Sequence, residues 1–179
     1  MIEALVRLIN KYQKSYMVTA EVGVFDGQTS FGYLDIIAKN NGKAYLIDWF
    51  KGNLGSDSGI HKFNPANEDI LYNNLCNQLK SKNLEQFTTI IKNNSIDAAS
   101  EIPDNSLDIC FIDADHKYLP VLEDIKTYLP KIKSGGIICG HDCVSMEYAN
   151  TFSEEDLKSE FKVIEGLYPS GGLHPGVIQ

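Results

Sequence analysis

Residues 17–30, M-V-T-A-E-V-G-V-F-D-G-Q-T-S, decide the fold of this chain. Apolar side chains alternate over 18–22, as they do on one side of a buried β-strand. Gly23 and Gly27 then free the backbone for a tight turn and for the close approach of a ligand. Residues 31–39 carry apolar side chains at helical spacing. The stretch therefore predicts a strand, a glycine loop with a ligand site, and a helix.

The composition indicates one globular domain. At 179 residues the chain is long enough to bury a continuous core, and its 43% hydrophobic and 22% charged residues are ordinary. No apolar run approaches the roughly 20 residues that cross a bilayer, so no membrane partner is expected. The net charge of −8 repels polyphosphate, so nucleic acid is not an expected partner. The amphipathic pattern of residues 1–14 indicates a docking helix rather than a secretion signal, and the cysteines lack a secreted spacing. These features predict a cytoplasmic protein.

Strands and helices alternate along the rest of the chain. The strands are expected at 43–48, 87–92, 107–113 and 137–140, and the helices at 65–82, 95–101 and 119–132. This alternation predicts an α/β fold, a Rossmann-like, doubly wound and mostly parallel sheet with helices on both faces. The last of these helices is expected to direct five apolar side chains inward: Val121, Leu122, Ile125, Leu129 and Ile132.

Polar residues gather at the carboxyl ends of the predicted strands, where ligands bind in open α/β sheets. The first turn supplies Glu21, Gly23, Asp26 and Gly27, and the second strand ends at Asp48. An acid in that position can accept hydrogen bonds from both hydroxyls of a ribose. The sequence therefore predicts a nucleoside-containing ligand at this edge.

The glycine pattern argues against a dinucleotide. G-x-G-x-x-G is absent, because V-F-D follows Gly23. Asp26 would also face a pyrophosphate at the helix N-terminus, where an anion needs donors. A cofactor with a cationic sulfonium and no phosphate tolerates that acid, and Asn94 and Ser95 after the third strand can contact its base edge. A nucleotide-binding oxidoreductase is the less favoured alternative.

A second group of polar residues lies at the ends of the fourth and fifth strands. Asp113 and Asp115 are two positions apart, and His141 and Asp142 end the neighbouring strand. Three carboxylates so close together would raise one another's pKa values, so a divalent cation is a natural resident. The C-x-H-x-C pattern of 139–143 is an alternative metal site, although it lacks the C-x-x-C-type spacing usual for zinc.

The motifs resemble those of a known family. E-V-G-V-F-D-G at 21–27, followed by an acidic end of the second strand, resembles the cofactor-binding motifs of class I S-adenosylmethionine-dependent methyltransferases. The runs D-I-C-F-I-D-A-D-H-K-Y (108–118) and L-P-K-I-K-S-G-G-I-I-C-G-H-D (129–142) are similar to the subfamily with cephalosporin-hydroxylase-like and antibiotic-sugar O-methyltransferase members. The resemblance covers roughly residues 15–142.

This resemblance implies the strand order 3-2-1-4-5 and a single domain over 1–179. Residues 1–14 would be the docking helix, 15–142 the cofactor-binding core and 143–179 a variable C-terminal segment. The family has seven strands, whereas this sequence supplies five, so strands 6 and 7 are expected to be missing or rearranged. The uncovered edge of the fifth strand then predicts a homo-oligomer.

The implied cofactor is S-adenosyl-L-methionine. The residues implied to bind it are Glu21, Gly23, Phe25, Asp26, Gly27, Asp48, Trp49, Asn94, Ser95 and Asp113. Within this set Asp48 is implied to hold the ribose hydroxyls, Trp49 to lie beside the adenine, and Glu21 to support the glycine loop.

The resemblance also implies a metal and a base. Asp113, His141 and Asp142 match metal ligands, Mg²⁺ or Mn²⁺ being the expected ions, although the related enzymes carry a carboxylate where this chain has His141. Asp115 or His116 is expected to accept the proton of the substrate hydroxyl. The predicted function is O-methylation of a small polar or sugar-like hydroxyl compound. A catalytically inactive cofactor-binding or interaction domain is the alternative.

Overall fold

The structure is a computed structural model that describes residues 2–52, 64, 66–141, 153, 162–163 and 172–173. Its strands are β1 (Val18–Val22), β2 (Lys43–Ile47), β3 (Thr88–Ile91), β4 (Leu107–Ile112), β5 (Ile132–Gly140), β6 (Lys162–Val163) and β7 (Gly172–Leu173). Its α-helices are α1 (Ile2–Tyr12), α2 (Gln28–Lys39), α3 (Asn67–Ser81), α4 (Ser95–Ala98) and α5 (Tyr118–Tyr128). Short 3₁₀-helices are η1 (Glu85–Phe87), η2 (Ala99–Glu101) and η3 (Leu129–Lys131). Within the described part of the chain, no helix is long and apolar enough to cross a membrane.

Five strands form one parallel sheet in the order β3-β2-β1-β4-β5, which confirms the predicted fold. β1 is central, with Ala20 opposite Tyr45 of β2 on one side and Cys110 of β4 on the other. Every residue of β4 is buried, as its nearly continuous apolar run predicts for a strand covered on both faces. All carboxyl ends of these strands therefore point to the same edge of the sheet.

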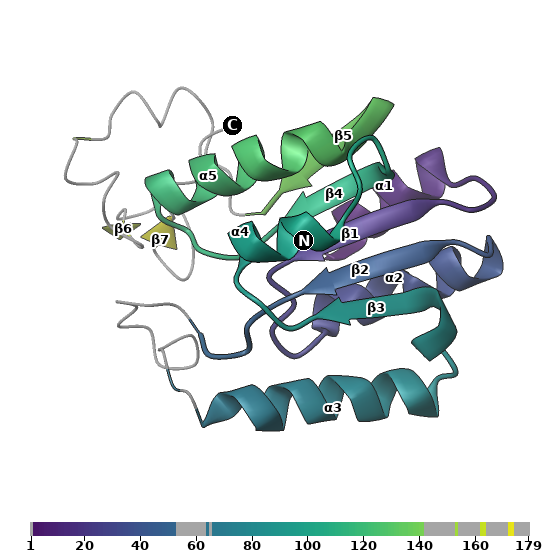
Figure 1. The fold of residues 1–179 in the computed structure, drawn as a ribbon, viewed down its shortest axis with the longest axis horizontal. Helices are drawn as coiled ribbons and strands as arrows, with labels where there is room; N and C mark the ends of the chain where they lie inside the picture. The colour runs from purple at the N-terminus through teal and green to yellow at the C-terminus, as the bar shows by residue number, and fades with distance from the viewer. Residues whose placement is uncertain are drawn as a thin grey trace.

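Helices cover the sheet on both faces (Figure 1). On one face α1, α2 and α3 pack over a core that includes Ile9, Leu34 and Leu75. On the other face α4, η2 and α5 pack over a second core that includes Val22 and Tyr128. The alternation of side chains along each strand supplies apolar groups to both layers.

The orientation of α5 differs from the prediction. Ile125 and Leu129 are 38% and 57% exposed, whereas Asp124 and Tyr128 are 2% and 0% exposed. The Tyr128 side chain is fully buried in the second core, and its hydroxyl donates to the Ser95 carbonyl oxygen at 2.7 Å, so Asp124, one turn earlier on the same face, also points inward. Ile132 lies in β5 rather than in the helix. The burial of the aromatic Tyr128 in the core thus decides which face of α5 points inward, and the apolar periodicity predicted another face.

β6 and β7 do not extend the main sheet. They pair with each other as a separate two-stranded antiparallel sheet, Lys162 opposite Leu173. Among the described residues, β5 pairs with β4 alone. This arrangement agrees with the expectation that the last two family strands are missing or rearranged. The homo-oligomer inferred from the β5 edge stays a prediction.

Candidate active site

A cavity of about 540 Å³ opens at the carboxyl edge of the sheet. Its walls come from the turn after β1, the end of β2, the start of α4, the loop after β4 and the first turns of α5. Ten of the residues proposed from the sequence line it: Gly23, Phe25, Asp26, Asp48, Trp49, Asn94, Ser95, Asp113, Asp115 and His116. These ten residues, which are far apart in the sequence, therefore lie around one cavity.

Three other predicted residues have different positions. Glu21 and Gly27 are not among the residues that line the cavity, and neither is His141, which contacts Asp113. The predicted metal ligand Asp142 lies outside the described residues. Cys143, a member of the alternative cysteine-histidine site, does too.

The two loop glycines are required for different reasons. Gly23 has φ +93°, and a Cβ there would collide with the carbonyl oxygen of Asp113, so β1 and β4 meet backbone to backbone. Gly27 has φ +83°, and a Cβ there would lie 2.7 Å from Cδ1 of Leu75 and 2.9 Å from Cε2 of Phe31. Gly27 thus lets the loop pack on the α3 side, whereas Gly23 shapes the cavity floor.

Asp26 caps the first turn of α2. Its Oδ1 accepts from the Gln28 N–H at 3.0 Å, and the preceding N-cap residue, Gly27, has no side chain to do so. The carboxylate therefore already supplies negative charge at the helix N-terminus, where a dinucleotide site would place its pyrophosphate.

Glu21 is buried where β1 meets α2. It is 1% exposed, and its Oε2 accepts from the Ser30 hydroxyl at 2.7 Å and the Tyr33 hydroxyl at 2.9 Å. Its Oε1 has no hydrogen-bond partner among the described residues. Burial raises the pKa of Glu21 to about 8, so its carboxyl group is mainly protonated at neutral pH. The side chain joins β1 to α2.

Asp48 holds two backbone segments together. Its Oδ2 accepts from the Val24 N–H at 2.8 Å and the Phe25 N–H at 2.7 Å, and its Oδ1 accepts from the Phe50 N–H at 2.6 Å. Phe25 and Phe50 both have left-handed backbone conformations, with φ of 52° and 61°. Burial raises the pKa of Asp48, and the backbone donors oppose that rise. Three backbone N–H groups therefore already occupy most of the acceptor capacity of this carboxylate, and the ribose contact predicted for Asp48 stays a prediction.

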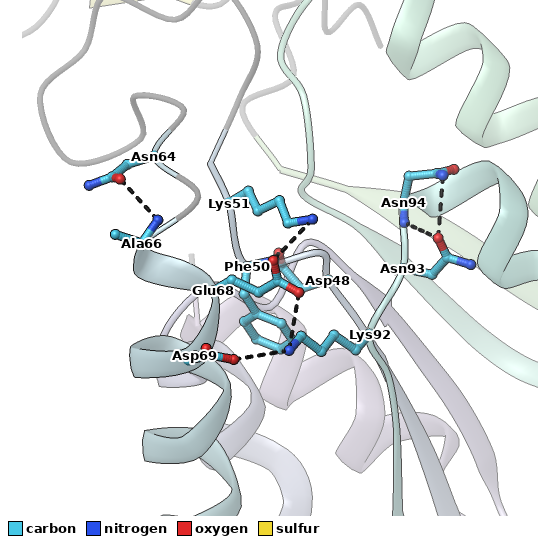
Figure 2. A network of polar contacts seen from close by, with 10 residues as sticks. All are labelled: Asp48, Phe50, Lys51, Asn64, Ala66, Glu68, Asp69, Lys92, Asn93 and Asn94. Atoms are coloured by element: carbon cyan, nitrogen blue, oxygen red, sulfur yellow. Dashed lines mark hydrogen bonds and ion pairs between the residues drawn. The ribbon is translucent and has the colours of Figure 1, made fainter.

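A polar network anchors the chain beyond Trp49 (Figure 2). Glu68 of α3 lies between two lysines, 3.0 Å from Lys51 Nζ and 3.1 Å from Lys92 Nζ. Lys92 also pairs with Asp69 at 3.4 Å, and the Asn64 N–H donates to the Lys51 carbonyl oxygen at 2.7 Å. The segment that carries Trp49 is thereby joined to α3 and to the end of β3. Sequence reasoning missed this network, because it treated residues 49–64 as one polar loop.

The start of α4 uses Asn94 as its cap. Asn94 Oδ1 accepts from the Asp97 N–H at 2.9 Å, and Asn94 Nδ2 donates to Asp97 Oδ2 at 2.7 Å. The side chain predicted to contact a base edge is thus occupied by the helix, although Asn94 and Ser95 both line the cavity.

Asp113 lies between two histidines. Its Oδ1 is 3.4 Å from His116 Nε2 and 3.5 Å from His141 Nδ1. Burial opposes ionisation, but hydrogen bonding and charge from the two histidines outweigh it and lower the pKa of Asp113 to about 2. Asp115 has a different partner: its Oδ1 accepts from the N–H of Lys117, the residue before α5, at 2.9 Å.

The predicted metal ligands are only partly described. In the described ranges, no group of three His, Cys, Asp or Glu side chains is placed to hold a metal ion. His141 directs Nδ1 at Asp113 Oδ1, a pairing between two proposed ligands. With Asp142 outside those ranges, the metal site stays a prediction.

Asp124 is the functional candidate that the sequence analysis missed. It lines the cavity from α5 and is 2% exposed. Burial raises its pKa to about 6; the nearby Ser95 hydroxyl opposes this rise, and the charges of Asp115 and Glu123 add to it. The signal that could have found it is the spacing of Pro120, Asp124 and Tyr128, which share one helical face.

The cavity wall is acidic. Among the described residues that line it there is no lysine or arginine, and His116 is the one side chain that can become a cation. The acids are Asp26, Asp48, Asp113, Asp115, Glu123 and Asp124. Such a wall suits a cationic ligand and disfavours a polyphosphate.

Residues 20–143 match a protein family described as a methyltransferase domain. The chain belongs to this methyltransferase domain family. The match, together with the structural likenesses below, confirms the class I methyltransferase resemblance carried by the strand-end motifs. The resemblance to the antibiotic-sugar subfamily stays a prediction.

Related proteins share the domain at low identity. An uncharacterised protein of Acanthamoeba polyphaga mimivirus is 26% identical over 140 residues, which are 77% of this chain and 57% of that protein. A structure assigned as a caffeoyl-CoA O-methyltransferase from Staphylococcus aureus has a TM-score of 0.59 at 17% identity, covering 79% of this chain and 56% of that one. The methyltransferase domain thus spans little more than half the length of either relative.

Two further solved structures share the fold. An SAH-bound methyltransferase from Podospora anserina has a TM-score of 0.58 at 12% identity, covering 77% of this chain and 50% of that one. An rRNA methylase from Streptococcus thermophilus has a TM-score of 0.57 at 13% identity, covering 91% of this chain and 84% of that one. At these identities the likeness shows the fold alone.

Proposed function

We propose that this methyltransferase domain binds S-adenosyl-L-methionine in the acidic cavity and methylates a hydroxyl of a small polar or sugar-like molecule. The observation that carries the proposal is the cavity wall, which has six acids and no lysine or arginine among its described residues. S-adenosylmethionine has a sulfonium and an ammonium group and lacks phosphate, so its charge complements that wall. A dinucleotide would bring two phosphates to the same acids.

The residues present fit this cofactor. When bound, it supplies an electrophilic methyl group on a positively charged sulfur. The Gly23 turn and Asp113 would hold its methionine end, with Asp113 ionised at neutral pH because its pKa is about 2. Trp49 and Ser95 would flank its nucleoside end, since both line the cavity. The support comes from the chemistry of these groups.

His116 is the proposed base. It lies 3.4 Å from Asp113 Oδ1, and a carboxylate in that place orients an imidazole and stabilises its protonated form. His116 would take the proton from the substrate hydroxyl while the oxygen bonds to the methyl carbon and the carbon–sulfur bond breaks. Asp115 is the alternative base, although one of its oxygens already holds the Lys117 N–H.

Calorimetric titration with S-adenosylmethionine and with NAD tests the cofactor. Wild-type protein is expected to bind the first and not the second, and Asp113→Asn to weaken binding. Asp48→Ala is a poor probe, because it also removes three backbone contacts. Asp35→Asn, an exposed acid on α2, is the matched control. Binding of NAD alone, or of neither molecule, would refute the proposal.

Turnover tests the catalytic half. Release of S-adenosylhomocysteine is measured with a panel of sugars and polyols, and His116→Gln is expected to lower kcat by about 10²- to 10⁴-fold without loss of cofactor binding. Cofactor binding without turnover on any hydroxyl acceptor would favour the inactive binding domain instead.

Two finer expectations join the same proposal. A Mg²⁺ or Mn²⁺ ion at Asp113, His141 and Asp142 predicts metal-stimulated turnover that Asp142→Ala abolishes. The edge of β5, which pairs with β4 alone among the described residues, predicts a homo-oligomer, to be measured by light scattering over a concentration series. Neither a metal-independent rate nor a monomer would disturb the cofactor proposal.

A further inference from the structure

Asp124 is a buried acid that forms no ion pair within the described part of the chain. It lies on α5 at 2% exposure, and no ion pair among the described residues includes it. The groups that act on its charge are the Ser95 hydroxyl and two other carboxylates. An ionised carboxyl group in such surroundings is unfavourable unless a donor satisfies it. Because Asp124 lines the cavity, that donor can come from a ligand.

The surroundings of Asp124 suit a flat ring with a hydrogen-bond donor. Ser95 and Ile96 at the start of α4 and Pro120 on α5 line the same cavity. Ile96 and Pro120 contribute apolar surface to the cavity wall, and Asp124 and Ser95 contribute polar groups. An apolar pocket with a few placed polar groups is the usual form of a site for a heterocycle.

Asn94, which also lines the cavity at this end, is oriented by α4. Its Oδ1 accepts from the Asp97 N–H as the helix cap, and its Nδ2 donates to Asp97 Oδ2. A carboxylate has about four acceptor positions, so Asp124 can accept from a ligand while it accepts from Ser95. Asp124 therefore has more acceptor capacity than the single amide oxygen of Asn94, which already accepts from the Asp97 N–H.

We propose that Asp124 accepts a hydrogen bond from the exocyclic amine of the cofactor's adenine and so selects adenine over purines that lack this amine. The inference rests on the proposed function, because it names the contact that fixes the base of the same cofactor. Asp113 and His116 serve the reacting end, while α4 and α5 form the base end. Asp124 is thus a specificity-determining residue rather than a catalytic one.

The test is a double-mutant-type cycle that removes the amine from the ligand, the carboxylate from the protein, or both. S-adenosylhomocysteine and its 6-deamino analogue, with purine in place of adenine, are titrated against wild type and Asp124→Leu. Wild type is expected to prefer the adenine ligand by about 10- to 100-fold, as for a hydrogen bond to a charged group. Asp124→Leu is expected to bind both ligands equally, and the exposed-site control Asp35→Leu to retain the preference.

Each outcome has a distinct meaning. If wild type binds neither ligand, the proposed function fails as a whole. If wild type binds both equally, or Asp124→Leu keeps the preference, the Asp124 contact is overturned while the cofactor site stands. 5′-Methylthioadenosine, which lacks the amino acid, supplies a third arm. If Asp124→Leu weakens S-adenosylhomocysteine but not this nucleoside, the carboxylate holds the ammonium group, which also overturns the inference.

Discussion

Buried acids at the two ends of the parallel sheet differ in their partners, and their pKa values shift in opposite directions. At the amino end, Asp108 of β4 is 6% exposed and pairs with Lys14 at 2.8 Å and Lys133 at 2.9 Å. It also accepts from the Val18 N–H at 2.8 Å. Although burial opposes ionisation, these partners lower the pKa of Asp108. At the carboxyl end, Asp124 pairs with no cation among the residues that the structure describes, and its pKa is raised to about 6.

This contrast separates a structural acid from a binding acid. Asp108 is satisfied by its own chain, so its charge contributes to folding. Asp124 is ionised at a cost to folding, and a donor from outside would relieve that cost. The contrast is the physical basis for the ligand contact that we propose at the carboxyl end.

The largest effect is expected for Asp48→Ala, an acid at the carboxyl end whose partners are backbone groups. Three N–H groups lose their acceptor, and the left-handed Phe25 and Phe50 lose the group that holds them. We expect a loss of about 4 kcal/mol in the free energy of unfolding, measured by urea denaturation. A loss below that of Asp26→Ala, which removes one acceptor, would show that the loop keeps its shape by itself.

Asp108→Ala should cost about 3 kcal/mol, because Lys14, Lys133 and the Val18 N–H are left without their acceptor. The folded pKa lies below the ordinary value of 3.8, so this contribution is present above pH 4 and is lost as the pH falls through the folded pKa. Urea titrations at several pH values measure it. An equal cost at pH 2 and pH 7 would contradict the ion-pair explanation.

Asp124→Asn should raise the free energy of unfolding, whereas Asp108→Ala lowers it. The folded pKa of about 6 lies above the ordinary value of 3.8, so ionisation disfavours the folded state. We expect the ligand-free variant to gain at most about 3 kcal/mol above pH 6. The gain should shrink as the pH falls through 6 and vanish below about pH 4. Thermal unfolding across this range provides the measurement. Destabilisation of the variant at pH 8 would contradict the claim that ionised Asp124 disfavours the folded state.

The smallest effect is expected for Lys92→Met, which removes a surface cation shared by Glu68 and Asp69. Exposed ion pairs contribute little individually, so we expect the loss of cofactor affinity to be no more than several-fold. Its cause would be a looser placement of Trp49. Trp49 is the sole tryptophan of the chain, so its fluorescence reports binding directly. The matched control is Lys39→Met, at the far end of α2. Equal affinities for both variants would mean that the network does not place Trp49.

The local parts of this site could be predicted from sequence, and the tertiary parts could not. The positive φ of Gly23 and the contact of Asp26 with the Gln28 N–H are local, so the turn could be predicted, whereas the close approach of Gly23 to Asp113 could not. The structural task of Asp48 depends on the left-handed Phe25 and Phe50, and no sequence pattern signals those conformations. Asp124 was missed because the apolar stripe through Ile125 predicted the wrong face of α5.

Tyr128 has a consequence for the rate of ligand entry. Its hydroxyl, fully buried and 2.7 Å from the Ser95 carbonyl oxygen, joins α4 to α5 before any ligand arrives. The base end of the cavity is thus preorganised, and little side-chain entropy remains to be lost there on association. Tyr128→Phe is then expected to slow capture of adenine nucleosides in stopped-flow fluorescence, even where the final affinity changes little.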